Sequence, residues 1–76
     1  MRLQIRGHPR QRMAQRGVTE ADIEHALTYF QTRWQTPTGG TQYVGPGIGG
    51  RRLKVWLVPP GLDADPVIVK SVAWAE

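Results

Sequence analysis

The clearest hydrophobic pattern in the chain lies between residues 19 and 30, where apolar side chains recur at the spacing of an α-helix. Its members are Ile23, Ala26, Leu27 and Phe30, at positions i, i+3, i+4 and i+7. Thr19 is a suitable N-cap, and Glu20 and Asp22 fall in the first turn, where carboxylates suit the helix dipole. The pattern therefore predicts an amphipathic helix that packs on the core.

Residues 9–16 predict an earlier helix, because Pro9 suits a helix start and Gly17 suits the position just past a helix end. Met13 is the single large apolar residue of this stretch. We therefore expect the helix to lie on the surface, with Met13 as its anchor.

Later stretches have the patterns of β-strands. Between residues 51 and 58, apolar and polar positions alternate with the period of a strand, with Leu53, Val55 and Leu57 on one side and Arg52, Lys54 and Trp56 on the other. Residues 67–74 are rich in β-branched residues, and the same alternation puts Lys70 on a side with Ile68, Val72 and Trp74. Residues 3–5 predict a short strand or an extended lead-in, and residues 31–50 predict loops and short strands. We predict one α+β domain over residues 1–76, with two N-terminal helices packed on a small antiparallel β-sheet of three to four strands.

The composition narrows the class of protein. The chain has 76 residues and no cysteine, which excludes disulfides, thiolate zinc sites and a cysteine nucleophile. No apolar run approaches the roughly 18 residues that span a bilayer, and no signal-peptide core follows Met1. We therefore expect a cytoplasmic protein with no membrane contact.

The charge favours a nucleic-acid partner. Lysine and arginine total 10 against 6 aspartate and glutamate, a formal charge of +4, and the only lysines are Lys54 and Lys70. The planar guanidinium of arginine pairs with phosphate oxygens and stacks on bases better than a lysine ammonium does. The arginine-rich composition therefore indicates RNA or another nucleic acid as the partner.

His8, Arg12 and Arg16 recur every four residues and fall on one face of the first predicted helix. Cleavage of RNA without a metal ion needs a group that moves a proton and a group that stabilises developing negative charge, and these residue types supply both. The alternative is a solvated basic face whose histidine merely starts a helix. We interpret His25 as a surface histidine with no role. The chain has no His-x-x-x-His pair and no HExxH motif, so we predict no metal and no cofactor.

Residues 45–50, Gly-Pro-Gly-Ile-Gly-Gly, formally match the dinucleotide-binding pattern G-x-G-x-x-G. They precede a predicted strand instead of a helix, so we interpret the segment as a hairpin connection. The alternative is a loop whose backbone N–H groups, beside Arg51 and Arg52, approach a phosphate. Trp34, Trp56 and Trp74 are likewise either base-stacking residues or core filler.

Taken together, these motifs resemble a known family. The N-terminal part is His8-x3-Arg12-Met13-x2-Arg16-Gly17-Val18-Thr19-x2-Asp22-Ile23, and the later part is Tyr43-x-Gly45, a Gly-Arg-Arg-Leu-Lys-Val strand and a final valine-rich strand. Over residues 7–74 the chain resembles the small bacterial domains catalogued as domain of unknown function 4258. Many members carry a threonine and an aromatic residue in the last strand, where this chain has Lys70 and Ser71 as the polar groups.

The resemblance implies a relative of the RelE-like and barnase-like toxin ribonucleases, with N-terminal helices followed by an antiparallel sheet. Members of that group cleave RNA without a metal ion and are often encoded beside an antitoxin. We therefore predict a small metal-independent endoribonuclease, the toxin of a toxin–antitoxin pair, with His8, Arg12 and Arg52 as catalytic residues. The residues predicted to bind RNA phosphates are Arg16, Arg51, Lys54 and Lys70. The alternative is a non-catalytic RNA-binding or protein-interaction module.

Overall fold

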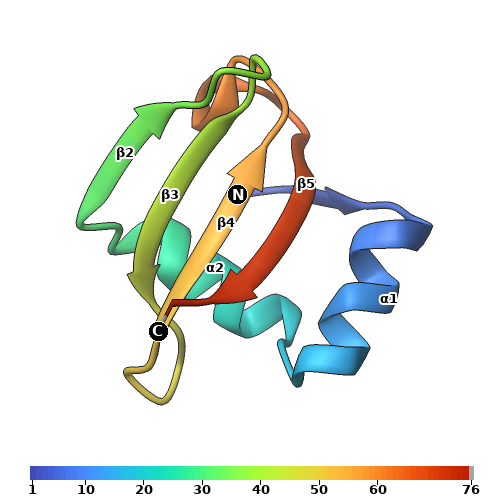
Figure 1. Cartoon of the computed structure of the whole chain (residues 1–76), viewed down its shortest axis with the longest axis vertical. Coiled ribbons are helices and arrows are strands. Elements are labelled where there is room, and N and C mark those ends of the chain that lie inside the picture. The colour runs from blue at the N-terminus through green and yellow to red at the C-terminus, as the bar shows by residue number, and fades with distance from the viewer. Residues whose placement is uncertain (76) are drawn as a thin grey trace.

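The computed structural model of the chain describes residues 1–75, which form two helices and one five-stranded sheet (Figure 1). In chain order the elements are β1 (Leu3–Ile5), α1 (Gly7–Arg16), α2 (Glu20–Thr28), β2 (Thr32–Gln35), β3 (Thr41–Pro46), β4 (Arg52–Leu57), a 3-10 turn (Gly61–Asp63) and β5 (Val67–Trp74). The predicted α+β domain with two N-terminal helices is confirmed. No helix within residues 1–75 is both long and apolar enough to span a membrane.

The sheet is larger than predicted and is mixed. Its strand order is β1-β5-β4-β3-β2, and β1 runs parallel to β5 while the other pairs are antiparallel. The predicted antiparallel sheet of three to four strands is therefore confirmed in part: three of the strand pairs are antiparallel, but the sheet has five strands and one parallel pair. The parallel pair joins residues near the two ends of the sequence, and β2 is a Thr-Arg-Trp-Gln segment with no buried residue and no hydrophobic alternation to mark it.

Both helix ends follow from their local sequence. The Thr19 hydroxyl accepts a hydrogen bond from the backbone N–H of Asp22, and the Asp22 carboxylate accepts one from the backbone N–H of Thr19, which is a complete capping box. Gly17 ends α1 with φ of 68°, a left-handed conformation that glycine adopts without steric cost.

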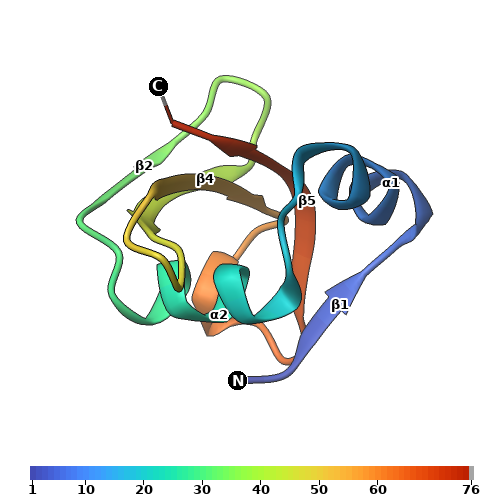
Figure 2. The same cartoon turned by 90° about the horizontal axis from the view of Figure 1, so that it is seen from below.

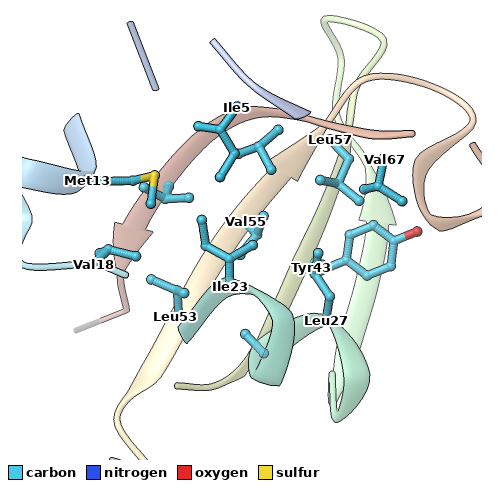
Figure 3. Close-up of a cluster of buried hydrophobic side chains, with 13 residues drawn as sticks. Ile5, Met13, Val18, Ile23, Leu27, Tyr43, Leu53, Val55, Leu57 and Val67 are labelled. Atoms are coloured by element: carbon cyan, nitrogen blue, oxygen red, sulfur yellow. The ribbon is translucent and has the colours of Figure 1, made fainter. Parts of the chain in front are cut away.

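The core lies between α2 and one face of the sheet, called here the inner face (Figure 3). Ile23, Ala26 and Leu27 of α2 are buried against a sheet whose inner face carries the predicted row of Leu53, Val55 and Leu57, all completely buried. Met13 anchors α1 as predicted. Phe30 was predicted to continue the buried face of α2, but the helix ends at Thr28 and Phe30 remains 38% exposed, edge-on to the Tyr43 ring.

The opposite face of the sheet, called here the outer face, is not covered by either helix of residues 1–75 (Figure 1). Figure 2 shows α2 below the sheet and α1 beside β5, while β2 and the end of β5 rise on the side away from α2. Strand pairing puts Trp34, Gln42, Lys54, Trp56, Ser71 and Ala73 on the outer face. Side chains from β2, β3, β4 and β5 therefore lie side by side on the outer face, although Gln42 there is only 7% exposed.

A β-bulge interrupts β5 at Lys70. Trp56 pairs with Ser71 and Leu57 pairs with Val69, so Lys70 is the extra residue between two paired positions. The strict alternation that put Lys70 on a side with Val72 and Trp74 was therefore wrong. Val72 is completely buried on the inner face, whereas Lys70 is exposed.

Gly45 sets how closely α2 approaches the sheet. A Cβ atom at this position would overlap the Ala26 carbonyl oxygen and would lie 2.9 Å from Phe30 Cα. Both are backbone atoms, so the clash can be relieved only by moving the helix. We expect Gly45→Ala to lower the free energy of unfolding by about 3 kcal/mol or more in a urea titration.

Gly49→Ala is the matched control, because a Cβ atom there meets nothing within 4 Å. Its free energy of unfolding should stay within about 0.5 kcal/mol of the wild type. Equal urea midpoints for the two variants would contradict the close packing of α2 on β3.

Candidate nucleic-acid interface

Acidic and basic side chains lie on different elements. Within residues 1–75, α1 and the five strands contain no aspartate or glutamate. The carboxylates are Glu20, Asp22 and Glu24 on α2, and Asp63 and Asp65 between β4 and β5. Because α2 covers the inner face, the outer face and α1 have an excess of positive charge, which attracts a polyanion.

His8 lies in a depression between the start of α1 and β5. The depression has a volume of about 390 Å³. Arg6, His8 and Lys70 supply its polar lining, and the apolar part includes Pro9 and Ile68. The structure thus brings together two residues singled out separately in the sequence, His8 and Lys70, and adds Arg6, which sequence analysis did not select.

Within residues 1–75, the start of α1 lacks the capping and acidic side chains that usually stabilise a helix N-terminus. Its N-cap, Arg6, makes no side-chain capping hydrogen bond, and its first turn contains no acidic residue. The first backbone N–H groups of a helix carry a partial positive charge and bind anions. A phosphate in the depression would therefore meet a helix N-terminus that no carboxylate of the described residues neutralises.

The start of α2 has the opposite character. The carboxylate of Asp22 accepts hydrogen bonds from the backbone N–H groups of Thr19 and Ile48 and from the Thr19 hydroxyl. Partial burial raises the pKa of Asp22, but these hydrogen bonds and the nearby His25 outweigh it, so the pKa lies below its ordinary value. The Asp22 carboxylate thus already provides a negative charge at the start of α2.

Arg12 lies one helical turn after His8 and is half-buried, but it is not among the residues that line the depression. Lys54 and Arg52 follow along β4 on the outer face. Trp56 pairs with Ser71, which is next to Lys70. Arg52 is four residues from Trp56 along β4, so at about 3.3 Å per residue it lies roughly 13 Å from Lys70 along the strand direction. The structure brings Arg12 to the same helix face as His8 but leaves Arg52 at the far end of β4.

Two of the predicted phosphate-binding arginines make contacts within the protein. The Arg16 guanidinium donates a hydrogen bond to the backbone oxygen of Val72, and Trp74 Nε1 donates one to the backbone oxygen of Arg16 at 2.6 Å. Arg51 lies over the Trp74 ring, 4.7 Å from its centroid. These contacts join the end of α1, the start of β4 and the end of β5. Within residues 1–75, no hydrogen bond or ion pair engages the side chains of Arg12, Arg52, Lys54 and Lys70.

The glycine-rich segment forms the hairpin connection between β3 and β4, as interpreted from the sequence. Gly47 N–H donates to the Arg51 carbonyl, Ile48 N–H to Asp22, and Gly50 N–H to the Gly47 carbonyl. Because these donors already have acceptors, the alternative of a phosphate-binding loop has little support.

The interpretation of His25 as a histidine with no role was wrong. It is half-buried, and its Nδ1 lies 2.8 Å from the carbonyl oxygen of Pro46, which connects α2 to β3. Its ring also packs on Tyr29. No local pattern in the sequence marks this contact, because its two partners are far apart along the chain.

No group of three or more histidine, cysteine or acidic side chains within residues 1–75 is placed to hold a metal ion.

Comparison with known protein families, curated proteins and solved structures finds no match to this chain.

The pKa of Asp22 gives a testable pH dependence. Because folding lowers this pKa, Asp22 stabilises the fold above its unfolded pKa, about 3.9, and this contribution is lost as the pH falls through the lower folded value. Urea midpoints measured between pH 6 and pH 2.5 should fall less steeply below pH 4 in Asp22→Asn than in the wild type. Glu24→Gln, a change at an exposed carboxylate on the same helix, should keep the wild-type slope, and identical profiles for all three proteins would contradict this role of Asp22.

Proposed function

We propose that this protein is a small, metal-independent endoribonuclease of the toxin type that cleaves RNA in the depression between α1 and Lys70. The observation that carries the proposal is the meeting of His8, Lys70 and Arg6 at a helix N-terminus that lacks an acidic residue. These groups supply a proton-transfer residue and positive charge at one phosphate. The resemblance of the α1 motif to toxin ribonucleases points in the same direction.

The proposed reaction is an internal transesterification. The His8 imidazole takes the proton of a ribose 2′-hydroxyl, and the 2′-oxygen forms a bond to the adjacent phosphorus. The bond between phosphorus and the 5′-oxygen then breaks, which leaves a 2′,3′-cyclic phosphate on one fragment. The departing 5′-oxygen takes a proton from the Lys70 ammonium or from water and becomes a hydroxyl. None of these steps requires a metal ion or a cofactor.

The remaining cations have separate proposed roles. Arg12, on the same face of α1 as His8, stabilises the charge that develops on the phosphorane oxygens. Lys54 and Arg52 lie farther along the outer face and bind neighbouring phosphates of the same strand. Arg16 and Arg51 hold the end of β5 in place. A cognate antitoxin would cover the outer face, and a cytoplasmic location fits such a pair.

The second candidate is a non-catalytic RNA-binding module. It is favoured by one observation: the depression is lined by one histidine and no carboxylate, so the only second group there that could transfer a proton is the Lys70 ammonium. Such a module would lose affinity step by step as cations are removed, whereas an enzyme loses most of its rate with His8.

The first test is cleavage of a labelled mixed-sequence RNA in excess EDTA. We expect wild-type protein to produce fragments ending in 2′,3′-cyclic phosphate, and His8→Ala to be at least about 100-fold slower because it has lost the proton-transfer group. Gln15→Ala, a change at an exposed position of the same helix, is purified identically and should cleave at the wild-type rate. Equal cleavage by all three would identify a contaminating nuclease, and no cleavage by folded wild-type protein would favour the binding module.

A separate prediction concerns the path of RNA over the outer face. Lys54→Met should reduce the slope of log affinity against log salt by about 0.7, the value for one phosphate contact to a single strand. Arg2→Met is the matched control, because Arg2 is paired with Asp65 outside the outer face, and its slope should equal that of the wild type. The slopes can be measured by fluorescence anisotropy at salt concentrations from about 50 to about 300 mM. Equal slopes for the two variants would contradict an RNA path along β4.

A further inference from the structure

A second depression lies beside Lys70 on the outer face. It has a volume of about 220 Å³ and is lined by Thr36, Thr38, Trp56, Lys70 and Ser71. Lys70 also lines the depression that contains His8, so its side chain stands between the two. The bulge in β5 produces this arrangement, because it adds Lys70 to the outer face beside Ser71.

Trp56 lies on the outer face of β4 and is not part of the hydrophobic core. It pairs with Gln42 of β3 on one side and with Ser71 of β5 on the other, and Gln42 is only 7% exposed. The core side of the same strand is filled by Leu53, Val55 and Leu57. An indole ring on the surface of a sheet offers a flat apolar face on which a planar ligand can stack.

The wall opposite Trp56 is a turn with a defined conformation. The Thr36 hydroxyl accepts a hydrogen bond from the Gly40 N–H at 3.1 Å, and Gly39 N–H donates to the Thr36 carbonyl at 3.0 Å. Thr38 and Ser71 carry further hydroxyls: that of Thr38 is hydrogen-bonded to the Thr36 hydroxyl at 3.2 Å, and that of Ser71 has no hydrogen-bond partner within residues 1–75. Hydroxyls that both donate and accept suit the edge of a nucleobase.

Size and charge favour one unpaired base over other occupants. The depression is smaller than the roughly 300 Å³ or more of a typical small-molecule pocket, so it suits a single planar ring. Its lining contains no carboxylate, and its one charge is the Lys70 ammonium at the border with the phosphate depression. An aromatic side chain of a peptide would fill the ring site but would bring no phosphate to Lys70.

We propose that the depression between Trp56 and the 36–40 turn binds one unpaired nucleobase of single-stranded RNA, stacked on Trp56, while Lys70 binds the adjoining phosphate. This rests on the proposed function in placing RNA at Lys70, and it adds that the substrate is single-stranded. A base within a duplex is already stacked and paired, so it cannot enter the depression.

The test measures binding without cleavage. The probe is a fluorescein-labelled, mixed-sequence five-nucleotide RNA with 2′-O-methyl groups, which lacks the 2′-hydroxyl nucleophile, and affinity is followed by anisotropy at several salt concentrations in EDTA. We expect Trp56→Leu to weaken binding by about 5- to 150-fold, the range for loss of one base–aromatic stack, with an unchanged salt slope. Lys70→Met should instead lower the salt slope by about 0.7.

Two further variants control the result. Trp56→Tyr keeps an aromatic ring and should recover most of the affinity lost in Trp56→Leu. Tyr29→Leu removes an aromatic side chain that is 60% exposed at the end of α2, away from the outer face, and should bind as the wild type does. Wild-type protein alone provides a test that needs no variant: it should bind the single strand more tightly than a duplex or an abasic strand of the same length.

Equal affinity of Trp56→Leu and wild type, or equal wild-type affinity for the single, abasic and duplex strands, would overturn the base subsite. Such a result would leave the ribonuclease proposal standing if RNA cleavage depends on His8. Conversely, base-dependent binding without cleavage would support the subsite and reject the enzyme. Competition by an unphosphorylated aromatic peptide as strong as that by the RNA would also overturn the proposal.

Discussion

Of the two helices within residues 1–75, only α2 covers a face of the five-stranded sheet, and that constraint governs the rest of the structure. α2 packs on the inner face so closely that β3 needs a glycine at the contact, and it buries the apolar residues of β4 and β5 there. The other face receives no helix (Figure 1). Its strands must therefore carry polar and amphipathic side chains, and this requirement produces the surface on which the candidate site lies.

The position of α1 is related to the shortness of β1. β1 is only three residues long and pairs with the first part of β5, so the remaining edge of β5 would be left open. α1 lies along that edge, and Arg16 donates to the carbonyl of Val72, which a neighbouring strand would otherwise have engaged. Placing the helix beside the strand, instead of over a face, puts His8 level with the bulge at Lys70.

Local features were predictable and long-range ones were not. The capping box at Thr19, the glycine after α1 and the alternation in β4 act within a few residues, so the sequence predicted both helices and the buried row of β4. No local pattern marked the bulge at Lys70, whose position depends on how β5 aligns with β4. His8 and Lys70 were each recognised by residue type, but their adjacency depends on the parallel pairing of the chain's two ends. For the same reason, the sequence alone could not distinguish Arg16 and Arg51, which make contacts within the protein, from arginines that face the solvent.

The parallel pairing of β1 with β5 also has a consequence for biosynthesis. The depression beside α1 joins residue 8 to residue 70, so it is absent from any nascent chain whose last strand is still inside the ribosome. Domains fold as units, and here the final strand lies between β1 and β4 in the middle of the sheet order. The depression therefore forms only after β5 has left the ribosome, and a product truncated before β5 would carry the basic helix without it.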